Sequence, residues 1–430
     1  MVLALAACSH RGPVAPNGGA GPASPDRAPA TSESRIAGRP STAEAIRIFE
    51  GRVARSPQDA VSYTILGRLY LREAKETGDL ADYPKAETAL RKALDLLPSY
   101  SPAKVPLAAA LSMQHKFAET LKLAQDITAS RPNDAGALAL IGDAQLELGN
   151  YPDAENAYRE LARRDSSAPA LSRLAHLAEL QGRWDDAFQL MGRARKEALE
   201  GSGTNDEKAW YDVRLGHLYL DNGNPEHASR YCEEALELSP NSPLTLAGLG
   251  EVRAAQKRYD DAIALYRRAV SIREEPSSLI MLGDLYAVAG RMKEARDHYN
   301  RAEAFMENSP LREAYRRELS LFYADHDLKL DKALGLAQAD LTARKDVYAY
   351  DTMAWALYKN NRLNEAARVI ADAMKLGTRS ASLYYHAGMI HYRLGKNGMA
   401  RRYLKQALEI NPRFSLLHED EARRALAALR

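Results

Sequence analysis

The residue types that most often carry catalysis do not fall into a functional arrangement in this sequence. His386 and His391 are five residues apart, so on one helix they do not share a face as zinc ligands four residues apart would. Ser101 opens an SxxK sequence, but Pro102 and the position at an expected helix start argue against a nucleophile there. The run 325–327, Asp-His-Asp, is typical of a turn. We therefore expect no catalytic residue, no metal ion and no cofactor.

A concentration of aromatic side chains near the C-terminus is the strongest candidate for a binding surface. Asp351, Trp355 and Tyr358 fall at i, i+4 and i+7 and form one stripe of an expected helix. A separate apolar stripe through Met353 and Leu357 is the face that a core would bury. Because a helix with one buried face does not need a second apolar stripe, the aromatic stripe calls for another explanation.

An internal repeat determines how this helix is placed. Where two antiparallel helices cross closely, only a small side chain leaves room for the partner backbone. Such a residue recurs at intervals of 33 to 41 positions, as expected for the second helix of a repeated helix–turn–helix unit. The ten positions are Ala86, Thr120, Ala154, Ala187, Ala228, Ala262, Ala295, Ala333, Ala366 and Ala400.

These units resemble the tetratricopeptide repeat family over residues 60–412. The resemblance implies an all-α fold, a right-handed α-solenoid of about ten repeats, with a half repeat at 41–57 and a capping helix at 413–430. One position departs from the pattern, because Asp340 stands where the two following units have Ala373 and Ala407. We expect the unit around 311–344 to be the least regular.

The resemblance also implies where partners bind. In this family the first helices line a concave groove, and the positions of the last two units that would face it are Tyr348, Asp351, Trp355, Tyr358, Lys359, Tyr385, Met389, Tyr392 and Arg393. We expect an extended or helical peptide here, anchored by the rings and oriented by Asp351, Lys359 and Arg393. Five rings left half open would present about 500 Å² of largely apolar surface.

An alternative is that these rings pack on one another and on the closing helix within 416–429. Trp210 and His217 are the candidates for a weaker second site. Charge is balanced, with 59 Lys and Arg against 57 Asp and Glu, so nothing indicates a nucleic-acid partner. Partners are therefore expected to be proteins or peptides, and arrays of this kind can also form homodimers through either end.

The cysteines and the first residues bear on localisation. Only Cys8 and Cys232 occur, which excludes a disulfide scaffold. Leu5-Ala6-Ala7-Cys8 resembles the lipobox of bacterial lipoproteins, which implies that 1–8 is a residual signal and that Cys8 carries a lipid anchor. Residues 9–35 are rich in Pro, Gly, Ala and Ser, and we expect a disordered tether there. Only seven residues precede Cys8 and none is basic, which favours a true start further upstream.

These features together predict a non-catalytic scaffold for protein–protein interactions. The resemblance to a lipobox implies a location on the periplasmic side of the bacterial outer membrane. Two alternatives stay open: a substrate-selecting adaptor subunit of a glycosyltransferase-like enzyme complex, and a cytoplasmic adaptor in which Cys8 follows an Ala-rich start by coincidence.

Overall fold

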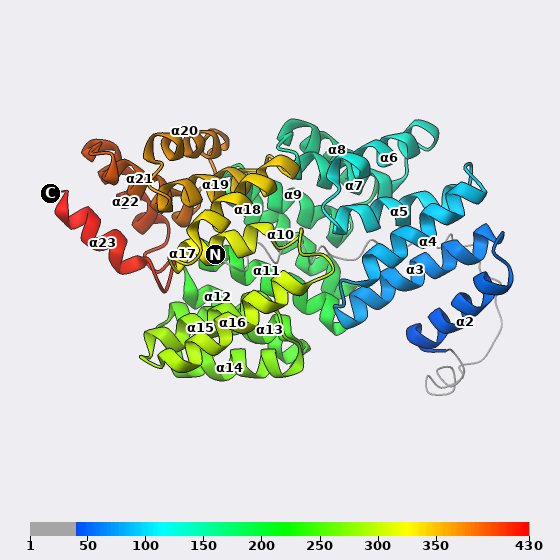
Figure 1. The fold of residues 1–430 in the computed structure, drawn as a ribbon, viewed down its shortest axis with the longest axis horizontal. Helices are drawn as coiled ribbons and strands as arrows, with labels where there is room; N and C mark the ends of the chain where they lie inside the picture. The colour runs from blue at the N-terminus through cyan, green and yellow to red at the C-terminus, as the bar shows by residue number, and fades with distance from the viewer. Residues whose placement is uncertain (1–39, 430) are drawn as a thin grey trace. The chain divides into compact units, whose positions relative to one another are not determined.

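The computed structural model describes residues 40–429, and the regular elements in that range are helices without any strand (Figure 1). Helices alternate as first (A) and second (B) members of antiparallel pairs, preceded by α2 (Thr42–Arg55) and followed by α23 (Glu419–Ala428). The pairs are α3 (Ala60–Thr77) with α4 (Asp82–Leu96), α5 (Ser101–Met113) with α6 (Phe117–Ser130), α7 (Ala135–Glu147) with α8 (Tyr151–Arg164), α9 (Ala168–Leu180) with α10 (Trp184–Glu200), α11 (Asn205–Asp221) with α12 (Pro225–Leu238), α13 (Pro243–Ala255) with α14 (Tyr259–Ile272), α15 (Pro276–Val288) with α16 (Met292–Asn308), α17 (Arg316–Asp325) with α18 (Leu330–Ala343), α19 (Val347–Lys359) with α20 (Leu363–Ala373), which continues into η2 (Met374–Leu376), and α21 (Ala381–Arg393) with α22 (Asn397–Ile410).

The small residues of the B helices lie where the sequence places them. All ten are fully buried. The facing positions on the A helices are equally tight: a Cβ added at Gly283 would lie 2.3 Å from Cε1 of Tyr299 on the paired helix. Small residues at both positions therefore set the helix-to-helix distance, and the predicted α-solenoid of helix pairs is confirmed.

The irregular unit near 311–344 keeps the same packing with different residues. In α17 the small position is Ser320, whose hydroxyl donates a hydrogen bond to the Ala333 carbonyl oxygen at 2.8 Å. Asp340, the departure from the pattern in α18, is buried and accepts a hydrogen bond of 2.9 Å from Nε of Arg317. An ion pair thus replaces the apolar contact that an alanine makes in the neighbouring units.

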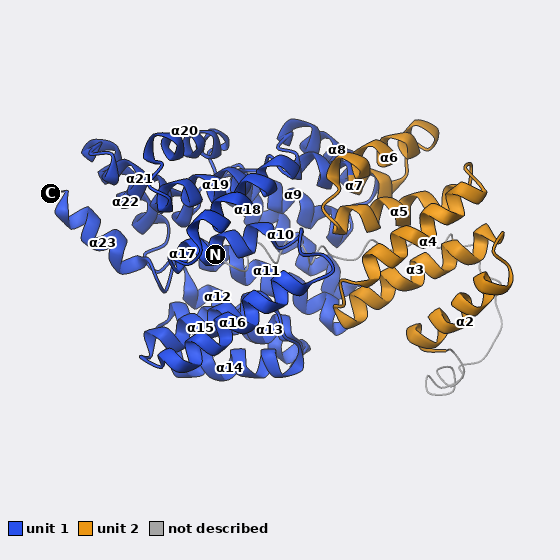
Figure 2. Cartoon of the chain, viewed as in Figure 1, with its two compact units in different colours: residues 1–12, 141–430 blue, residues 13–140 orange. Residues whose placement is uncertain are grey.

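The described residues belong to two compact units, an N-terminal unit within 13–140 and a C-terminal unit within 141–430 (Figure 2). In the N-terminal unit, Ile46 of α2 packs with Leu66, Leu90 and Leu107 in one core cluster. The predicted signal and tether, 1–8 and 9–35, lie outside the described residues. The division into half repeat, array and cap stays a prediction.

Within the C-terminal unit, the turns between A and B helices (A–B turns) contact chain that follows much later in the sequence. Four segments after residue 340 each donate a hydrogen bond to a carbonyl oxygen in the last turn of an A helix, where the helix dipole is negative. The donors and acceptors are Lys345 N to Glu147 O at 2.9 Å, Thr378 Oγ1 to Leu180 O at 2.5 Å, Asn411 Nδ2 to Leu220 O at 3.0 Å, and Arg413 Nη1 to Ala255 O at 2.9 Å. The C-terminal unit therefore closes on itself.

Glycine makes this closure fit. Gly149, Gly182 and Gly223 each have a positive φ in an A–B turn, and a Cβ there would lie 2.4 to 2.7 Å from a backbone oxygen of the docked chain. Only glycine, which has no Cβ, therefore fits at these turns. Since the docked chain is a turn between a B helix and the next A helix (B–A turn), backbone meets backbone at each contact.

Replacing Gly182 with alanine is expected to destabilise the C-terminal unit more than the same change at Gly290. The two glycines have similar φ values, +69° and +74°, so the backbone strain of about 1 kcal/mol is common to both. At Gly182 the new Cβ would lie 2.6 Å from the Gly377 oxygen, whereas at Gly290 nothing lies within 4 Å. Separating the docked turns adds about 1 to 3 kcal/mol. Urea unfolding of both variants measures the difference, and equal losses would mean that docking contributes no stability.

Candidate functional site

The predicted aromatic residues do converge on the A helices α19 and α21. The Trp355 ring stacks on Tyr358 with centroids 4.7 Å apart and lies 5.6 Å from the Tyr385 ring. Met389 belongs to the same hydrophobic cluster. The face assigned to these residues from the repeat register is thus a single surface in the folded chain.

The expectation that these rings are open is wrong. Asp351, Trp355, Tyr358, Tyr385 and Met389 are buried, with Trp355 only 1% exposed and Tyr385 fully covered. The remaining candidates keep more contact with solvent: Tyr348 and Tyr392 are half-buried, Lys359 has a 13% exposed side chain, and Arg393 is exposed. For these four, peptide binding stays a prediction.

The chain after α22 covers the rings. The Tyr385 hydroxyl donates a hydrogen bond of 2.6 Å to Oε2 of Glu421 in α23, and its ring lies 5.2 Å from the Phe414 ring. The His418 ring, directly before α23, stacks on Tyr385 at 5.2 Å. The alternative interpretation, in which the rings pack on one another and on the closing helix, describes the structure.

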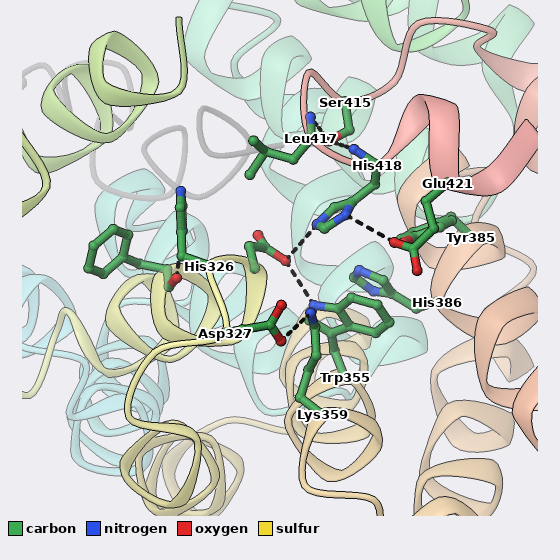
Figure 3. A network of polar contacts seen from close by, with 12 residues as sticks. His326, Asp327, Trp355, Lys359, Tyr385, His386, Ser415, Leu417, His418 and Glu421 are labelled. Atoms are coloured by element: carbon green, nitrogen blue, oxygen red, sulfur yellow. Dashed lines mark hydrogen bonds and ion pairs between the residues drawn. The ribbon is translucent and has the colours of Figure 1, made fainter. Parts of the chain in front are cut away.

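A half-buried carboxylate takes part in the network of polar contacts that joins this cover to the rings (Figure 3). Asp325, the last residue of α17, accepts a hydrogen bond of 2.8 Å from Nε1–H of Trp355 on its Oδ1 atom. His418 Nε2 lies 3.2 Å from the same oxygen, and Nδ1 of that ring is 3.7 Å from Oε2 of Glu421. Helices α17, α19 and α23 are therefore joined through one polar cluster.

The pKa values in this cluster indicate a charged imidazole between two carboxylates. Burial alone would lower the pKa of His418, but the hydrogen bond with Asp325 and the contact with the Glu421 carboxylate outweigh it and raise the pKa to about 9. Burial would raise the pKa of Asp325, yet the contact with His418 lowers that pKa to about 2. The contact with His418 also lowers the pKa of Glu421 to about 2. At neutral pH the cover over the rings is an ion triad.

His418 is expected to make the stability of the C-terminal unit fall as the solution becomes alkaline. Its folded-state pKa of about 9 lies above the ordinary value of 6.5, so its stabilisation is complete below pH 6.5 and is lost as the pH rises through 9. The loss is about 3 kcal/mol at most. The free energy of unfolding should be measured in urea at about pH 6 and about pH 9.5 for the natural chain and for His418→Gln. The variant should lose this part of the pH dependence; an unchanged difference would contradict the assignment.

Acid–base pairs continue along the A helices of the C-terminal unit. Five largely buried pairs each join two successive A helices of this unit, and in one of them the partner, His326, directly follows its helix. They are Asp143 with Arg173 at 3.1 Å, Glu179 with Arg214 at 3.2 Å, Glu251 with His217 at 3.4 Å, Asp284 with His326 at 2.8 Å, and Asp351 with His386 at 2.8 Å. Many of the acidic side chains on the A helices are therefore already paired with basic side chains of the same chain.

The proposed second site, Trp210 and His217, lies on α11. His217 is 7% exposed, and mainly because of burial its pKa is lowered to about 4, so the ring is neutral at pH 7. Trp210 is half-buried with its ring edge-on to Tyr211 at 4.8 Å. One turn beyond His217, half-buried Asp221 has a pKa raised to about 7 by burial and by the nearby carboxylates of Glu179 and Glu251. This part of the A-helix face is acidic.

Asp325, His418 and Glu421 were not identified from the sequence. The run 325–327 has the composition of a turn, and it does begin the A–B turn after α17. Nothing in the repeat pattern connects it with residues 93 to 96 positions later in the chain. Only the proximity of α23 to α17 and α19 reveals the cluster.

Two other kinds of site are not found within residues 40–429. No cluster of three or more His, Cys, Asp or Glu side chains is arranged to hold a metal ion. No helix in this range combines the length and the apolar character needed to cross a bilayer.

Comparison with protein families defines the class. Models of the tetratricopeptide repeat match residues 107–169, 139–200, 207–275, 242–308 and 381–414, which together span more than half of the chain. The chain therefore belongs to the tetratricopeptide repeat family, a class of repeat proteins that bind protein partners.

Individual relatives share only part of their length with this chain. Human protein O-mannosyl-transferase TMTC1 is 29% identical over 218 residues, which cover 49% of this chain and 24% of that protein. Cellulose synthase operon protein C of Xanthomonas axonopodis pv. citri is 28% identical over 189 residues, 42% of this chain and 12% of that protein. Among solved structures, yeast Tom70 is 15% identical with a TM-score of 0.39, over 90% of this chain and 92% of its own.

Proposed function

We propose that this chain is a non-catalytic scaffold that binds segments of partner proteins. The observation that supports the proposal is the tetratricopeptide repeat itself, present in the family matches and in the packing of ten small residues on the B helices. Arrays of such repeats offer extended binding surfaces without reacting groups. Binding would depend on which part of the A-helix face stays accessible.

The accessible part of that face favours a basic partner segment. The rings of α19 and α21 are covered, whereas Asp221 of α11 is half-buried and belongs to none of the five acid–base pairs. Its neighbours Glu179 and Glu251 make this part of the face negative. The pKa of Asp221 is raised first by burial and then by the neighbouring carboxylates, and a Lys or Arg side chain placed there would relieve that repulsion. Tyr348, Lys359, Tyr392 and Arg393 would extend the contact along the later A helices.

Anisotropy measurements with two labelled peptides, one rich in Lys and Arg and one rich in Glu, test this preference. The basic peptide should bind, and Asp221→Asn combined with Glu251→Gln should weaken it about tenfold. Glu237→Gln combined with Asp260→Asn is the matched control, because it removes the same charge from exposed positions on α12 and α14. If both double variants bound the basic peptide equally weakly, the proposed binding site would be wrong.

We further propose that the scaffold is anchored to the bacterial envelope, facing the periplasm at the outer membrane, through a lipid on Cys8. The support is the sequence Leu5-Ala6-Ala7-Cys8 and the Pro- and Ala-rich run after it. Radiolabelled palmitate should label the natural chain and not Cys8→Ala when the gene is expressed with its upstream DNA. Absence of label in both would remove the anchor and leave a cytoplasmic adaptor.

A second candidate function is a substrate-selecting adaptor in a glycosyltransferase-like complex. It is favoured by the similarity to human protein O-mannosyl-transferase TMTC1. Affinity purification of the chain under native conditions separates the two functions, because an adaptor would bring glycosyltransferase activity with it. A homodimer also remains part of the proposal.

A further inference from the structure

The docked A–B turns of the C-terminal unit follow one another in order. The turns at Gly149, Gly182 and Gly223 contact Lys345, Gly377 and Ile410 respectively, so consecutive A–B turns meet consecutive B–A turns. The next A–B turn, after α13, meets the loop before α23 through Arg413. The series then stops. Gly290, in the turn after α15, has the same backbone shape with φ +74° and nothing within 4 Å of an added Cβ.

The turn at Gly290 has large apolar side chains beside the glycine, as the docked turns do. Unlike several of theirs, its apolar side chains are exposed to solvent. Two residues after the docked glycines stand Tyr151, Trp184 and Pro225, and Trp184 and Pro225 are buried. The corresponding residue after Gly290 is Met292, which is 52% exposed, and Val288 before it is 42% exposed. In the following A–B turn, Leu328 is 41% exposed. We call Val288, Met292 and Leu328 the open edge.

The same chain carries a B–A turn that resembles a docked one. Gly223 packs against Ile410-Asn411-Pro412, and Leu238-Ser239-Pro240 after α12 has the same sequence pattern. Asn411 and Ser239 each follow the last residue of a B helix, with φ and ψ of −146° and 105° and of −141° and 81°. Pro240 is exposed, and Ile272, at the next B–A turn, is 49% exposed.

Most of the exposed apolar side chains of the C-terminal unit lie at the open edge or at the B–A turn after α14. Among residues 141–429, six large hydrophobic side chains are exposed, and four of them are Val288, Met292, Leu328 and Ile272. The other two, Phe305 and Met399, belong to α16 and α22. Isolated exposed apolar residues need no explanation, but a series placed at the continuation of an existing contact does.

We propose that the open edge binds a second copy of this chain through the B–A turns after α12 and α14. The order of the internal contacts fixes the register: the turn at Gly290 meets Leu238-Ser239-Pro240 of the second copy, and Leu328 meets Ile272 of that copy. The contact is heterologous, because one edge of a chain meets a different edge of the next. Association therefore continues beyond a dimer as the protein concentration rises.

Sedimentation velocity of the full chain, from low micromolar to several hundred micromolar concentration, measures this association. The natural chain should gain mass steadily with concentration. Leu328→Glu and Ile272→Glu should each remain monomeric, because every contact needs one of these residues from each chain. Met292→Glu, at the most exposed position of the open edge, should weaken association at least tenfold. Met399→Glu is the matched control and should behave as the natural chain, and circular dichroism checks that each variant folds.

Mixing two variants tests the heterologous geometry directly. A Leu328→Glu chain keeps an intact Ile272, and an Ile272→Glu chain keeps an intact Leu328, so one good contact forms between them. The mixture should give a 1:1 complex that does not grow further. A natural chain that stays monomeric at every concentration, association that survives both substitutions, or a mixture that stays monomeric would each overturn the proposal.

Discussion

Trp355→Ala is expected to lower the free energy of unfolding of the C-terminal unit by about 3 to 5 kcal/mol. The indole is 1% exposed and packs on Tyr358, on Tyr385 and on the His386 ring at 4.2 Å. Its removal leaves a cavity between α17, α19 and α21 and takes one hydrogen-bond donor from half-buried Asp325. If the indole were a peptide anchor on an open surface, the same change would weaken binding and leave stability almost unaltered.

Urea unfolding followed by circular dichroism measures this loss. Trp210→Ala is the matched control, since Trp210 is half-buried on another A helix and should lose clearly less. Tyr385→Phe separates packing from polarity, because it removes only the hydroxyl that donates to Glu421, a hydrogen bond worth about 1 to 3 kcal/mol. A Trp355→Ala chain as stable as the natural one would refute the buried position.

Arg317→Met is expected to cost about 3 to 5 kcal/mol of stability, although methionine has a similar size. Arg317 is 2% exposed and donates to Asp340 at 2.9 Å and to Asp346 at 2.7 Å. Without the guanidinium, the negative charges of these two buried carboxylates repel each other and are less well neutralised. Removing one partner of a buried ion pair is more harmful than removing both.

A second substitution should therefore rescue the first. In Arg317→Met with Asp340→Ala, position 340 has the residue type of Ala373 and Ala407, and most of the lost stability should return. Asp346 remains satisfied because it caps α19, accepting hydrogen bonds from the backbone N–H groups of Tyr348 and Ala349 at 2.8 and 2.9 Å. The double-mutant cycle gives the coupling energy. Additive losses would show that Arg317 and Asp340 do not act as a pair.

The repeat pattern predicted the helices because each unit obeys a local steric rule. A small residue at Ala262 or Ala400 follows from the close approach of two helices, and that approach is set within about 30 residues of chain. Ser320 of α17 obeys the same rule, although its unit departs from the pattern at Asp340.

The burial of the predicted site could not be read from the same pattern. Trp355 and Tyr385 occupy the face expected of them, but Phe414, His418 and Glu421 cover that face, and these residues lie beyond the last repeat. Contacts such as Thr378 with Leu180 join residues nearly 200 positions apart. No periodicity encodes such a contact, since it depends on the small rotation accumulated over many units.

The docking of Lys345, Thr378 and Asn411 on earlier helix ends has a consequence for how this unit comes apart. Stacked repeats normally interact only with their immediate neighbours, so the terminal repeats can unfold first. Here the last units also contact units in the middle of the array. Unfolding from the C-terminus must therefore break these contacts as well as those between neighbouring repeats. The long sequence separation of these contacts slows their formation, so the final closure should be the late step of folding.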